Sequence, residues 1–340
     1  MLLCEGYKRV IRGENRGGVA MDGPEVLLIG AGIVDVPLAP VSAAVFDAPS
    51  TSLERIALQP GGDALNEAVV LARLGRAPAL VSVVGRDAAG DYLMRRLEEA
   101  GVYVEGVARD PDMDTGVNVV LVGEDGERRF ITNRNGSLRR LGLKHIEPAL
   151  ELPALARARV ACLASLFVSP ALTLQDAAAL FDALKARGMT LCADATRRKH
   201  GETLKEAGAA LSRLDYFFPN LDEAALLTGE RDPDACADAL LACGVGHVAL
   251  KLGGEGCLLK SARERVRIPA HPVARCVDTT GAGDTFAGAF IAALIEGRPF
   301  ADCGRYANAA ASLCVESVGA TGGGWTRADV DARFGHLRAS

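Results

Sequence analysis

The chain has 340 residues, of which 49% are hydrophobic, and its formal net charge at pH 7 is −5. This composition supplies a large apolar core, and an acidic balance without a basic patch argues against nucleic acid as a partner. No apolar run approaches the roughly 18 residues that a membrane-spanning helix needs, so we expect no insertion into a membrane.

The beginning of the chain carries basic side chains and glycines but lacks the apolar stretch of a signal peptide. We therefore expect residues 1–23 to form a flexible extension. Nine cysteines are scattered along the sequence, none of them in a Cys-x-x-Cys pair. Several lie inside apolar runs, which is typical of buried thiols in a reducing compartment and predicts a cytoplasmic protein.

Apolar runs of strand length alternate with stretches of helical spacing along most of the chain. Strands are predicted at 26–30, 79–84, 160–164, 189–193, 215–218 and 247–252, and helices at 63–75, 89–100, 173–187 and 234–243. The last third is predicted to be mostly helical, at 283–296, 300–316 and 326–335. Strands that are apolar on both faces and alternate with helices indicate an α/β fold with a mostly parallel central sheet between two layers of helices.

Two segments break this alternation. Residues 36–60 have little helical periodicity and are expected to be irregular and extended. Residues 111–136 contain a predicted hairpin, with strands at 116–122 and 128–133 and an Asp-Gly pair in the turn. We infer that these two segments form a small sheet that projects from the core as a lid, and a long surface hairpin is the alternative.

The segment 30–35 ends the first predicted strand and reads Gly-Ala-Gly-Ile-Val-Asp. It lacks the third glycine of a dinucleotide-binding loop and has Asp35 in that place. A carboxylate there would repel a pyrophosphate, which argues against an NAD-dependent oxidoreductase. The carboxylate is better suited to accept hydrogen bonds from sugar hydroxyls, and a capping role at the end of the strand is the alternative.

Residues 278–290 are the most informative stretch. The small residues 281–283 precede Asp284 and an apolar run that suits a helix. Free N–H groups at a helix start, aided by the helix dipole, attract phosphate. A carboxylate beside such an anion site is suited to proton transfer during chemistry on that phosphate. The alternative is an ordinary turn in which Asp284 caps the helix.

A second motif, Gly61-Gly62-Asp63-Ala64-Leu65-Asn66-Glu67-Ala68, precedes this stretch by more than 200 residues. Together the two resemble, in the same order, the signatures of the PfkB (ribokinase-like) family of carbohydrate kinases. The resemblance covers residues 24–335 and is strongest to an uncharacterised bacterial branch of these sugar kinases. It implies a ribokinase-like fold, with residues 24–340 as one kinase domain and 36–60 and 111–136 as its lid segments.

The resemblance implies ATP-dependent phosphorylation of a monosaccharide hydroxyl, with Asp284 as the base and the amides of Gly281, Ala282 and Gly283 as the anion hole. Alternation along the predicted hairpin adds Asn118 as a lid contact, and Asp194-Ala195-Thr196-Arg197-Arg198 resembles a substrate-binding Asp-x-Asn-x-Arg motif with Thr196 in place of Asn. The expected substrate-binding residues are Asp35, Gly61, Gly62, Asn66, Asn118 and Arg198. The expected nucleotide-binding residues are Asn220, Glu223, Lys251, Gly253, Gly256 and Asn308.

Relatives of this kind imply ATP and Mg²⁺ as cofactors, with Glu223 holding Mg²⁺ through water. They also imply a potassium ion, for which the matching residues are Asp278, Thr280, Val315 and Val318. The lid segments contain only two aromatic residues, Phe46 and Phe130, which favours a monosaccharide over a nucleoside. A nucleoside kinase and a non-catalytic sugar or nucleotide sensor on the same fold are the alternatives. An exposed lid edge must be covered, so we expect a homodimer through the lid.

Overall fold

The computed structural model describes residues 23–123, 127–196 and 201–339. The predicted N-terminal extension, apart from Gly23, and the predicted substrate residue Arg198 lie outside the described residues.

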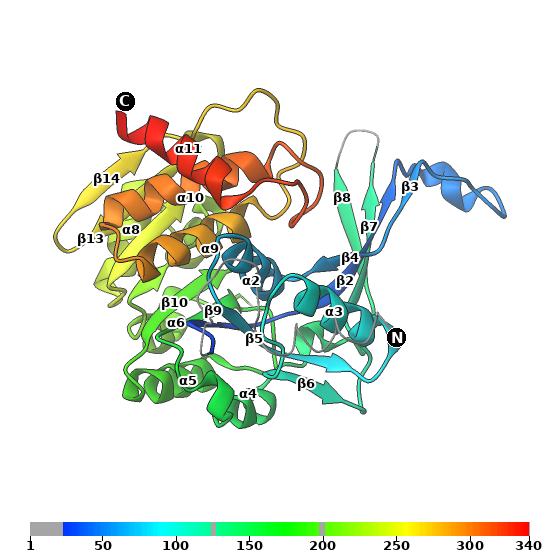
Figure 1. The fold of residues 1–340 in the computed structure, drawn as a ribbon, viewed down its shortest axis with the longest axis horizontal. Helices are drawn as coiled ribbons and strands as arrows, with labels where there is room; N and C mark the ends of the chain where they lie inside the picture. The colour runs from blue at the N-terminus through cyan, green and yellow to red at the C-terminus, as the bar shows by residue number, and fades with distance from the viewer. Residues whose placement is uncertain (1–22, 124–126, 197–200, 340) are drawn as a thin grey trace, which may run out of the picture.

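In the described part of the chain, a nine-stranded sheet runs through the centre of the molecule (Figure 1). Its strands are parallel except for the antiparallel edge formed by β12, β13 and β14. In spatial order they are β14 (Arg265–Ile268), β13 (Cys257–Ser261), β12 (His247–Lys251), β11 (Tyr216–Phe217), β10 (Thr190–Ala195), β9 (Val160–Leu166), β1 (Val26–Ile29), β5 (Pro78–Gly85) and β6 (Val107–Asp110).

Alternate side chains of the central strand enter two separate cores. Val26 and Leu28 of β1 pack on one side, and Leu27 and Ile29 pack on the other. The first core holds α2 (Asp63–Arg73), α3 (Ala88–Glu99), α9 (Ala282–Ile295), α10 (Phe300–Cys314) and α11 (Arg327–Ala339). The second holds α4 (Leu143–Leu150), α5 (Leu174–Ala186), α6 (Leu204–Leu211), α7 (Leu221–Thr228) and α8 (Pro233–Ala242). The predicted mostly parallel sheet between two helical layers is confirmed.

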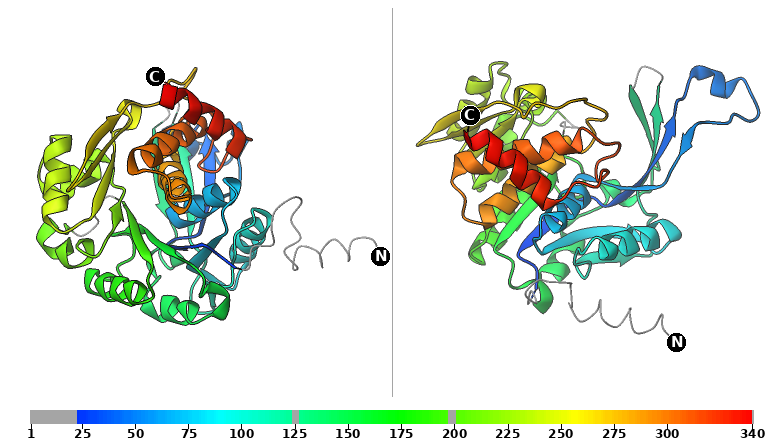
Figure 2. Two further views of the ribbon diagram at one scale, coloured as in Figure 1. Left: turned by 60° about the vertical axis from the view of Figure 1, so that its left-hand side comes forward. Right: turned by 45° about the horizontal axis from the view of Figure 1, so that its top comes forward.

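A second, smaller sheet stands away from the central one (Figures 1 and 2). Its strand order is β3 (Arg55–Ile56), β2 (Ile33–Ala39), β7 (Val117–Val122) and β8 (Arg128–Thr132), and β4 (Gln59–Gly61) also pairs with β2. The predicted hairpin is therefore present, although its turn at 124–126 lies outside the described residues. The segment 36–60 contributes strands as well as the short 3₁₀ helix Ala43–Phe46.

The structure corrects the predicted position of Asp35. The sequence pattern placed it where the first strand ends, but it lies inside β2, the first strand of the small sheet. The chain turns at Gly30, which has a φ of 156°, and enters this new strand at Ile33. Asp35 thus belongs to the projecting sheet.

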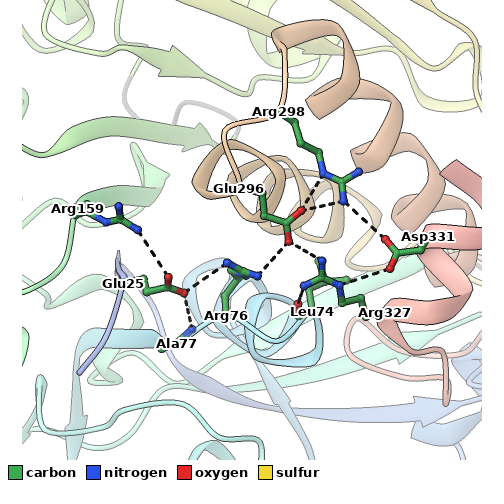
Figure 3. Close-up of polar contacts among 9 residues, drawn as sticks. All are labelled: Glu25, Leu74, Arg76, Ala77, Arg159, Glu296, Arg298, Arg327 and Asp331. Atoms are coloured by element: carbon green, nitrogen blue, oxygen red, sulfur yellow. Dashed lines mark hydrogen bonds and ion pairs between the residues drawn. The ribbon is translucent and has the colours of Figure 1, made fainter. Parts of the chain in front are cut away.

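A network of charged side chains fixes the helices on one face of the central sheet (Figure 3). Glu296 follows α9 and contacts Arg76, Arg298 and Arg327 at 3.1, 2.9 and 2.8 Å. Arg76 follows α2, and Arg327 opens α11. The network therefore ties together the C-terminal ends of α2 and α9, whose N-terminal ends lie at the candidate site.

Two negative observations apply to the described residues alone. None of the helices within them is both long enough and apolar enough to cross a bilayer. They also contain no ready-made group of three or more histidine, cysteine, aspartate or glutamate side chains able to hold a metal ion.

Candidate active site

The site lies at the carboxyl ends of the central parallel strands. The strand order reverses at β1. After β1 the chain adds β5 and β6 on one side of it, and it later adds β9 and β10 on the other side. In open α/β sheets such a reversal of strand order creates the crevice in which ligands bind. Asp194 near the end of β10 and Lys251 at the end of β12 project from this edge, and α2 and α9 begin beside it.

The start of α9 is shaped by Gly281, the N-cap residue, which has a φ of 75°. A Cβ at this position would lie 2.4 Å from the Cα of Ala320, so only glycine fits. Gly281 provides no side-chain oxygen for the N–H groups of the first turn, which therefore suits an anion. Among the predicted anion-hole amides, that of Ala282 donates to the carbonyl of Thr279 at 3.2 Å.

Asp284 faces the second motif and does not cap its own helix. Nδ2 of Asn66 donates to Oδ2 of Asp284 at 2.7 Å, across 218 residues of sequence. The Oδ1 atom of Asn66 is buried and has no hydrogen-bond partner among the described residues. Burial raises the pKa of Asp284 well above its ordinary value, and the nearby charge of Asp63 raises it further. A carboxylate with a raised pKa is suited to accept a proton near neutral pH.

The two glycines before α2 allow close approaches that any side chain would block. A Cβ at Gly61 would lie 2.2 Å from Oδ2 of Asp35, and a Cβ at Gly62 would lie 2.4 Å from the carbonyl oxygen of Ala31. Gly62 also has a φ of 98°, which favours glycine. Gly61 therefore lets the carboxylate of Asp35 lie directly against the segment that enters α2.

A row of polar side chains crosses the small sheet on one face. Asp35, Asn118 and Thr132 are aligned on β2, β7 and β8. Nδ2 of Asn118 donates to Oδ1 of Asp35 at 3.1 Å, and the hydroxyl of Thr132 donates to Oδ1 of Asn118 at 2.7 Å. The predicted lid contact Asn118 thus stands beside the predicted sugar ligand Asp35.

Lys251 lies beside the start of α9. A Cβ at Gly283 would lie 3.3 Å from Nζ of Lys251, so the ammonium group borders the predicted anion hole. Nζ also donates to both carboxylate oxygens of Asp194 at 2.7 Å. The side chains of Lys251 and Asp194 are only 12% and 3% exposed. This buried pair places a positive charge where phosphate is expected.

Carboxylates outnumber that positive charge. Burial raises the pKa of Glu67 and of Glu223, and both lie close enough to Asp63 for its charge to raise them further. Both carboxylate oxygens of Glu67 are buried, and Asp194 and Asp284 add to the rise of its pKa. A site with several carboxylates whose pKa values rise together lacks positive charge, and a divalent cation would supply it.

The predicted nucleotide residues occupy two places. Asn220 and Glu223 form a reciprocal capping box at the start of α7, with two hydrogen bonds of 2.8 Å, beside Lys251. Gly256 follows the 3₁₀ turn that begins at Gly253, and a Cβ there would lie 2.0 Å from the carbonyl oxygen of Ile268. Asn308 on α10 is buried and donates through Nδ2 to the carbonyls of residues 268 and 269, at 3.3 and 3.1 Å.

The predicted potassium ligands do come together, but hydrogen-bond donors already occupy two of them. The carboxylate of Asp278 accepts hydrogen bonds from the amide and hydroxyl of Thr280, from the amide of Gly319, and from Arg128 on β8. The carbonyl of Val315 accepts from the amides of residues 277 and 278 at 2.7 and 3.2 Å. Asp278 therefore already has a cationic partner, Arg128, at the place where the family resemblance implies a potassium ion.

The expected site residues leave out three that the structure brings into the site, although Asp194 belongs to the 194–198 motif. Asp63 lies within the second motif, Asp194 ends a buried strand, and Arg128 is one of several polar residues in the predicted hairpin. The position of Asp194 was the best available signal, because polar residues at the carboxyl end of a parallel strand face the ligand crevice. The pairing of Arg128 with Asp278 had no signal in the sequence.

Comparison with known proteins places this chain among carbohydrate kinases. A family model described as pfkB family carbohydrate kinase matches residues 24–327. The 2-dehydro-3-deoxygluconokinase of Bacillus subtilis is 31% identical over 266 residues, which is 75% of this chain and 80% of that protein. Arabidopsis thaliana ribokinase complexed with ribose and ATP is 26% identical with a TM-score of 0.75, covering 92% of this chain and 99% of the other. An Escherichia coli chain provisionally named ribokinase II, in complex with ATP and Mg²⁺, is 26% identical with a TM-score of 0.78 over the same shares.

Proposed function

The chain belongs to the pfkB family of carbohydrate kinases, and from this premise we propose how its residues phosphorylate a sugar. The hydrogen bond between Asn66 and Asp284 is the observation that carries the proposal. This bond joins two parts of the site. Asn66 belongs to the motif beside the sugar row, which is the row of Asp35, Asn118 and Thr132 on the small sheet, and Asp284 lies at the start of α9, which suits a phosphate. The substrate hydroxyl and the transferred phosphoryl group would therefore meet at Asp284.

In this mechanism the carboxylate of Asp35 accepts hydrogen bonds from sugar hydroxyls, and the side-chain amide of Asn118 also bonds the sugar. Oδ1 of Asn66 accepts a hydrogen bond from a sugar hydroxyl beside the one that reacts, whose own proton is directed at Asp284. Asp284 takes the proton of that hydroxyl as the oxygen attacks the γ-phosphorus of ATP and the bond to the leaving ADP breaks. The start of α9 and the ammonium group of Lys251 stabilise the charge on the transferring phosphoryl group. Phosphoryl transfer has a loose transition state, so positioning and electrostatic stabilisation supply most of the acceleration.

ATP and Mg²⁺ are the proposed cofactors. The carboxylates around Lys251 support a site that gains from a divalent cation. Mg²⁺ keeps several waters and is usually bound through one or two carboxylates and the phosphates of the substrate, so Glu223 is its proposed anchor through water. When bound, the ion neutralises charge on the phosphate oxygens. The proposed function does not require a potassium ion at Asp278, because Arg128 already supplies a cation there.

The acceptor is proposed to be a monosaccharide. The row of Asp35, Asn118 and Thr132 offers convergent polar groups, whereas a nucleoside needs an aromatic or broad apolar slot. ATP is kept inside the cell, so we place the reaction in the cytoplasm. We also propose a homodimer through the small sheet, because that sheet exposes Ile56, Phe130 and Ile131. The variant I131E would then sediment as a monomer.

The test measures ADP release with pentoses, hexoses, ketoses, sugar acids and nucleosides, using the wild-type chain and D284N. We expect one monosaccharide class to stimulate wild-type turnover. A positioned base contributes about 10²–10⁴ in rate, so D284N should lose at least about 10² in kcat while it still binds ATP. Near-normal turnover by D284N would contradict the role of Asp284. Preference for a nucleoside would favour the nucleoside kinase, and ligand binding without any turnover would favour a sensor.

A further inference from the structure

The ion pair between Arg128 and Asp278 joins two parts of the molecule that are 150 residues apart. Arg128 opens β8 in the small sheet, and Asp278 begins the segment that leads into the start of α9. One nitrogen of the guanidinium group donates to Oδ1 of Asp278. The Asp278 side chain is only 8% exposed and that of Arg128 is 29% exposed.

The remaining bonds of Asp278 shape the anion hole. Oδ1 accepts hydrogen bonds from the amide and the hydroxyl of Thr280 at 2.8 and 2.6 Å, directly before Gly281. Oδ2 accepts a hydrogen bond from the amide of Gly319 at 2.9 Å. Residue 320 is the one against which Gly281 packs. One carboxylate thus holds both loops that define the conformation of Gly281.

Such a carboxylate needs a positive charge beside it. Burial raises the pKa of Asp278, but the hydrogen bonds from Thr280, Gly319 and Arg128 outweigh this effect and lower the pKa to about 2. Asp278 is therefore ionised at neutral pH. Because the carboxylate of Asp278 is largely buried, water stabilises its negative charge poorly. Arginine keeps its charge at any physiological pH, so its guanidinium group can serve as a permanent counter-ion.

We propose that Arg128 is a built-in cation that takes the place of a potassium ion at the anion hole of this kinase. The inference rests on the proposed function, and it reverses the expectation that the family resemblance raised. The hydrogen bonds around Asp278 and Val315 support this proposal. Asp278 and the carbonyl of Val315 are both occupied by hydrogen-bond donors of the chain. The positive charge that balances Asp278 comes from the side chain of Arg128 and not from a bound ion.

The source of this cation has a second consequence. On β8, Arg128 lies on the same face as Thr132, because these residues are four positions apart and side chains alternate along a strand. The strand that carries one end of the sugar row thus also carries the counter-ion of the anion hole. The charge of Arg128 also acts on Asp35, whose pKa it lowers against the stronger effect of burial. A movement of the small sheet would therefore change both the sugar site and the phosphate site.

The chain offers a matched control at the next residue. Arg129 carries the same charge on the same strand, but it pairs with Leu121 on the opposite face and is exposed. We compare wild type, R128A, R128K and R129A in potassium and in choline chloride at equal ionic strength. Two quantities are measured: the thermal unfolding midpoint without substrates, and kcat with the best sugar.

Wild type and R129A should show the same midpoint and the same kcat in both salts. R128A should lose about 10²-fold in kcat in choline, the scale of one disturbed anion-hole donor. Millimolar potassium or guanidinium should raise both its midpoint and its kcat, and R128K should retain part of the activity. Two results would overturn the inference: a rise of the wild-type midpoint that is specific to potassium, or unchanged kcat of R128A in choline. The midpoint needs no turnover, so it separates failure of this inference from failure of the proposed kinase activity.

Discussion

The buried pair of Lys251 and Asp194 gives the sharpest prediction about stability. Substituting Lys251 by Met keeps most of the side-chain volume and removes the ammonium group. Two hydrogen bonds of 2.7 Å are then lost, and the carboxylate of Asp194 stays almost fully enclosed. Within the described residues, the amide of Ala195, at 2.7 Å, is the donor that remains.

The cost of K251M can be worked out from this burial. Removing one partner of a buried ion pair costs about 3–5 kcal/mol, because the remaining group must either keep an uncompensated charge or take up a proton. For a chain of this size each kcal/mol lowers the unfolding midpoint by about 2 °C, so we expect a decrease of about 6–10 °C. Lys251 also borders the anion hole, so kcat should decrease as well.

The stability lost in K251M should depend on pH in a way that identifies Asp194 as its cause. Burial raises the pKa of Asp194 to about 7, although Lys251 lowers it. A carboxyl whose pKa is raised in the folded state stabilises the protein at low pH and loses that contribution as pH rises through the folded pKa. In wild type this loss ends near pH 7. In K251M the pKa of Asp194 is higher still, so the variant should keep losing about 1.4 kcal/mol per pH unit between pH 7 and pH 8.

Urea unfolding of wild type, K251M and D194N/K251M at pH 6, 7 and 8 measures these differences. The double variant has no titrating group at residue 194 and should lose the extra dependence on pH. K260M is the matched control, because Lys260 pairs with the more exposed Asp234 and Asp238 and should cost about 1 kcal/mol or less. A K251M protein as stable as wild type at pH 8, or a loss equal at pH 6 and pH 8, would refute the reasoning.

Three further predictions concern the base, the helix start and the charged network. Since Asp63 raises the pKa of Asp284, kcat/KM should fall as the base is protonated at low pH, and D63N should move this fall to lower pH in a pH–rate profile; an unmoved profile would contradict the coupling. G281A should lose about 10²-fold or more in kcat, because its Cβ would overlap the neighbouring loop. G297A is the control, because residue 297 has a similar φ of 73° and no atom within 4 Å of an added Cβ. It should cost about 1 kcal/mol in urea unfolding and leave kcat normal. E296A should lower the free energy of unfolding by about 1–3 kcal/mol with unchanged kcat, since it breaks three arginine contacts away from the site; an equal loss of activity would show that the network also shapes catalysis.

Much of this architecture was visible in the sequence. The predicted strands and helices around the central sheet are present, because residues such as 160–164 are apolar on both faces and can only lie between two helical layers. The shorter elements were missed. The two-stranded edge β13–β14 and the helices α4, α6 and α7 are brief, and their patterns carry too few residues to define a period. The segment 30–39 was mispredicted for another reason. Its first residues look like the end of the first strand, but the chain turns at Gly30 and residues 33–39 form a strand of the second sheet.

The candidate site was predictable where one motif supplies both residue types and geometry. Gly61–Asn66 and 281–284 each describe a helix start, and helix starts at the same sheet edge can meet, as the bond from Asn66 to Asp284 confirms. Pairings that depend on strand register were not predictable. Whether Arg128 or Arg129 faces the anion hole is decided by the alignment of β8 against β7, and a shift by one residue would exchange them.

The arrangement of the site separates a fixed half from a half that belongs to another sheet. Asp284 and Asn66 lie on α9 and α2, whose far ends are held by Glu296 and its arginines. The proposed base and the proposed anion hole are therefore built on braced helices. The sugar row lies on the small sheet, which has its own strand pairing. Arg128 is the side chain that joins them by charge. If it neutralises Asp278, the anion hole is complete only while the small sheet is in place, and a diffusible ion could not provide that dependence.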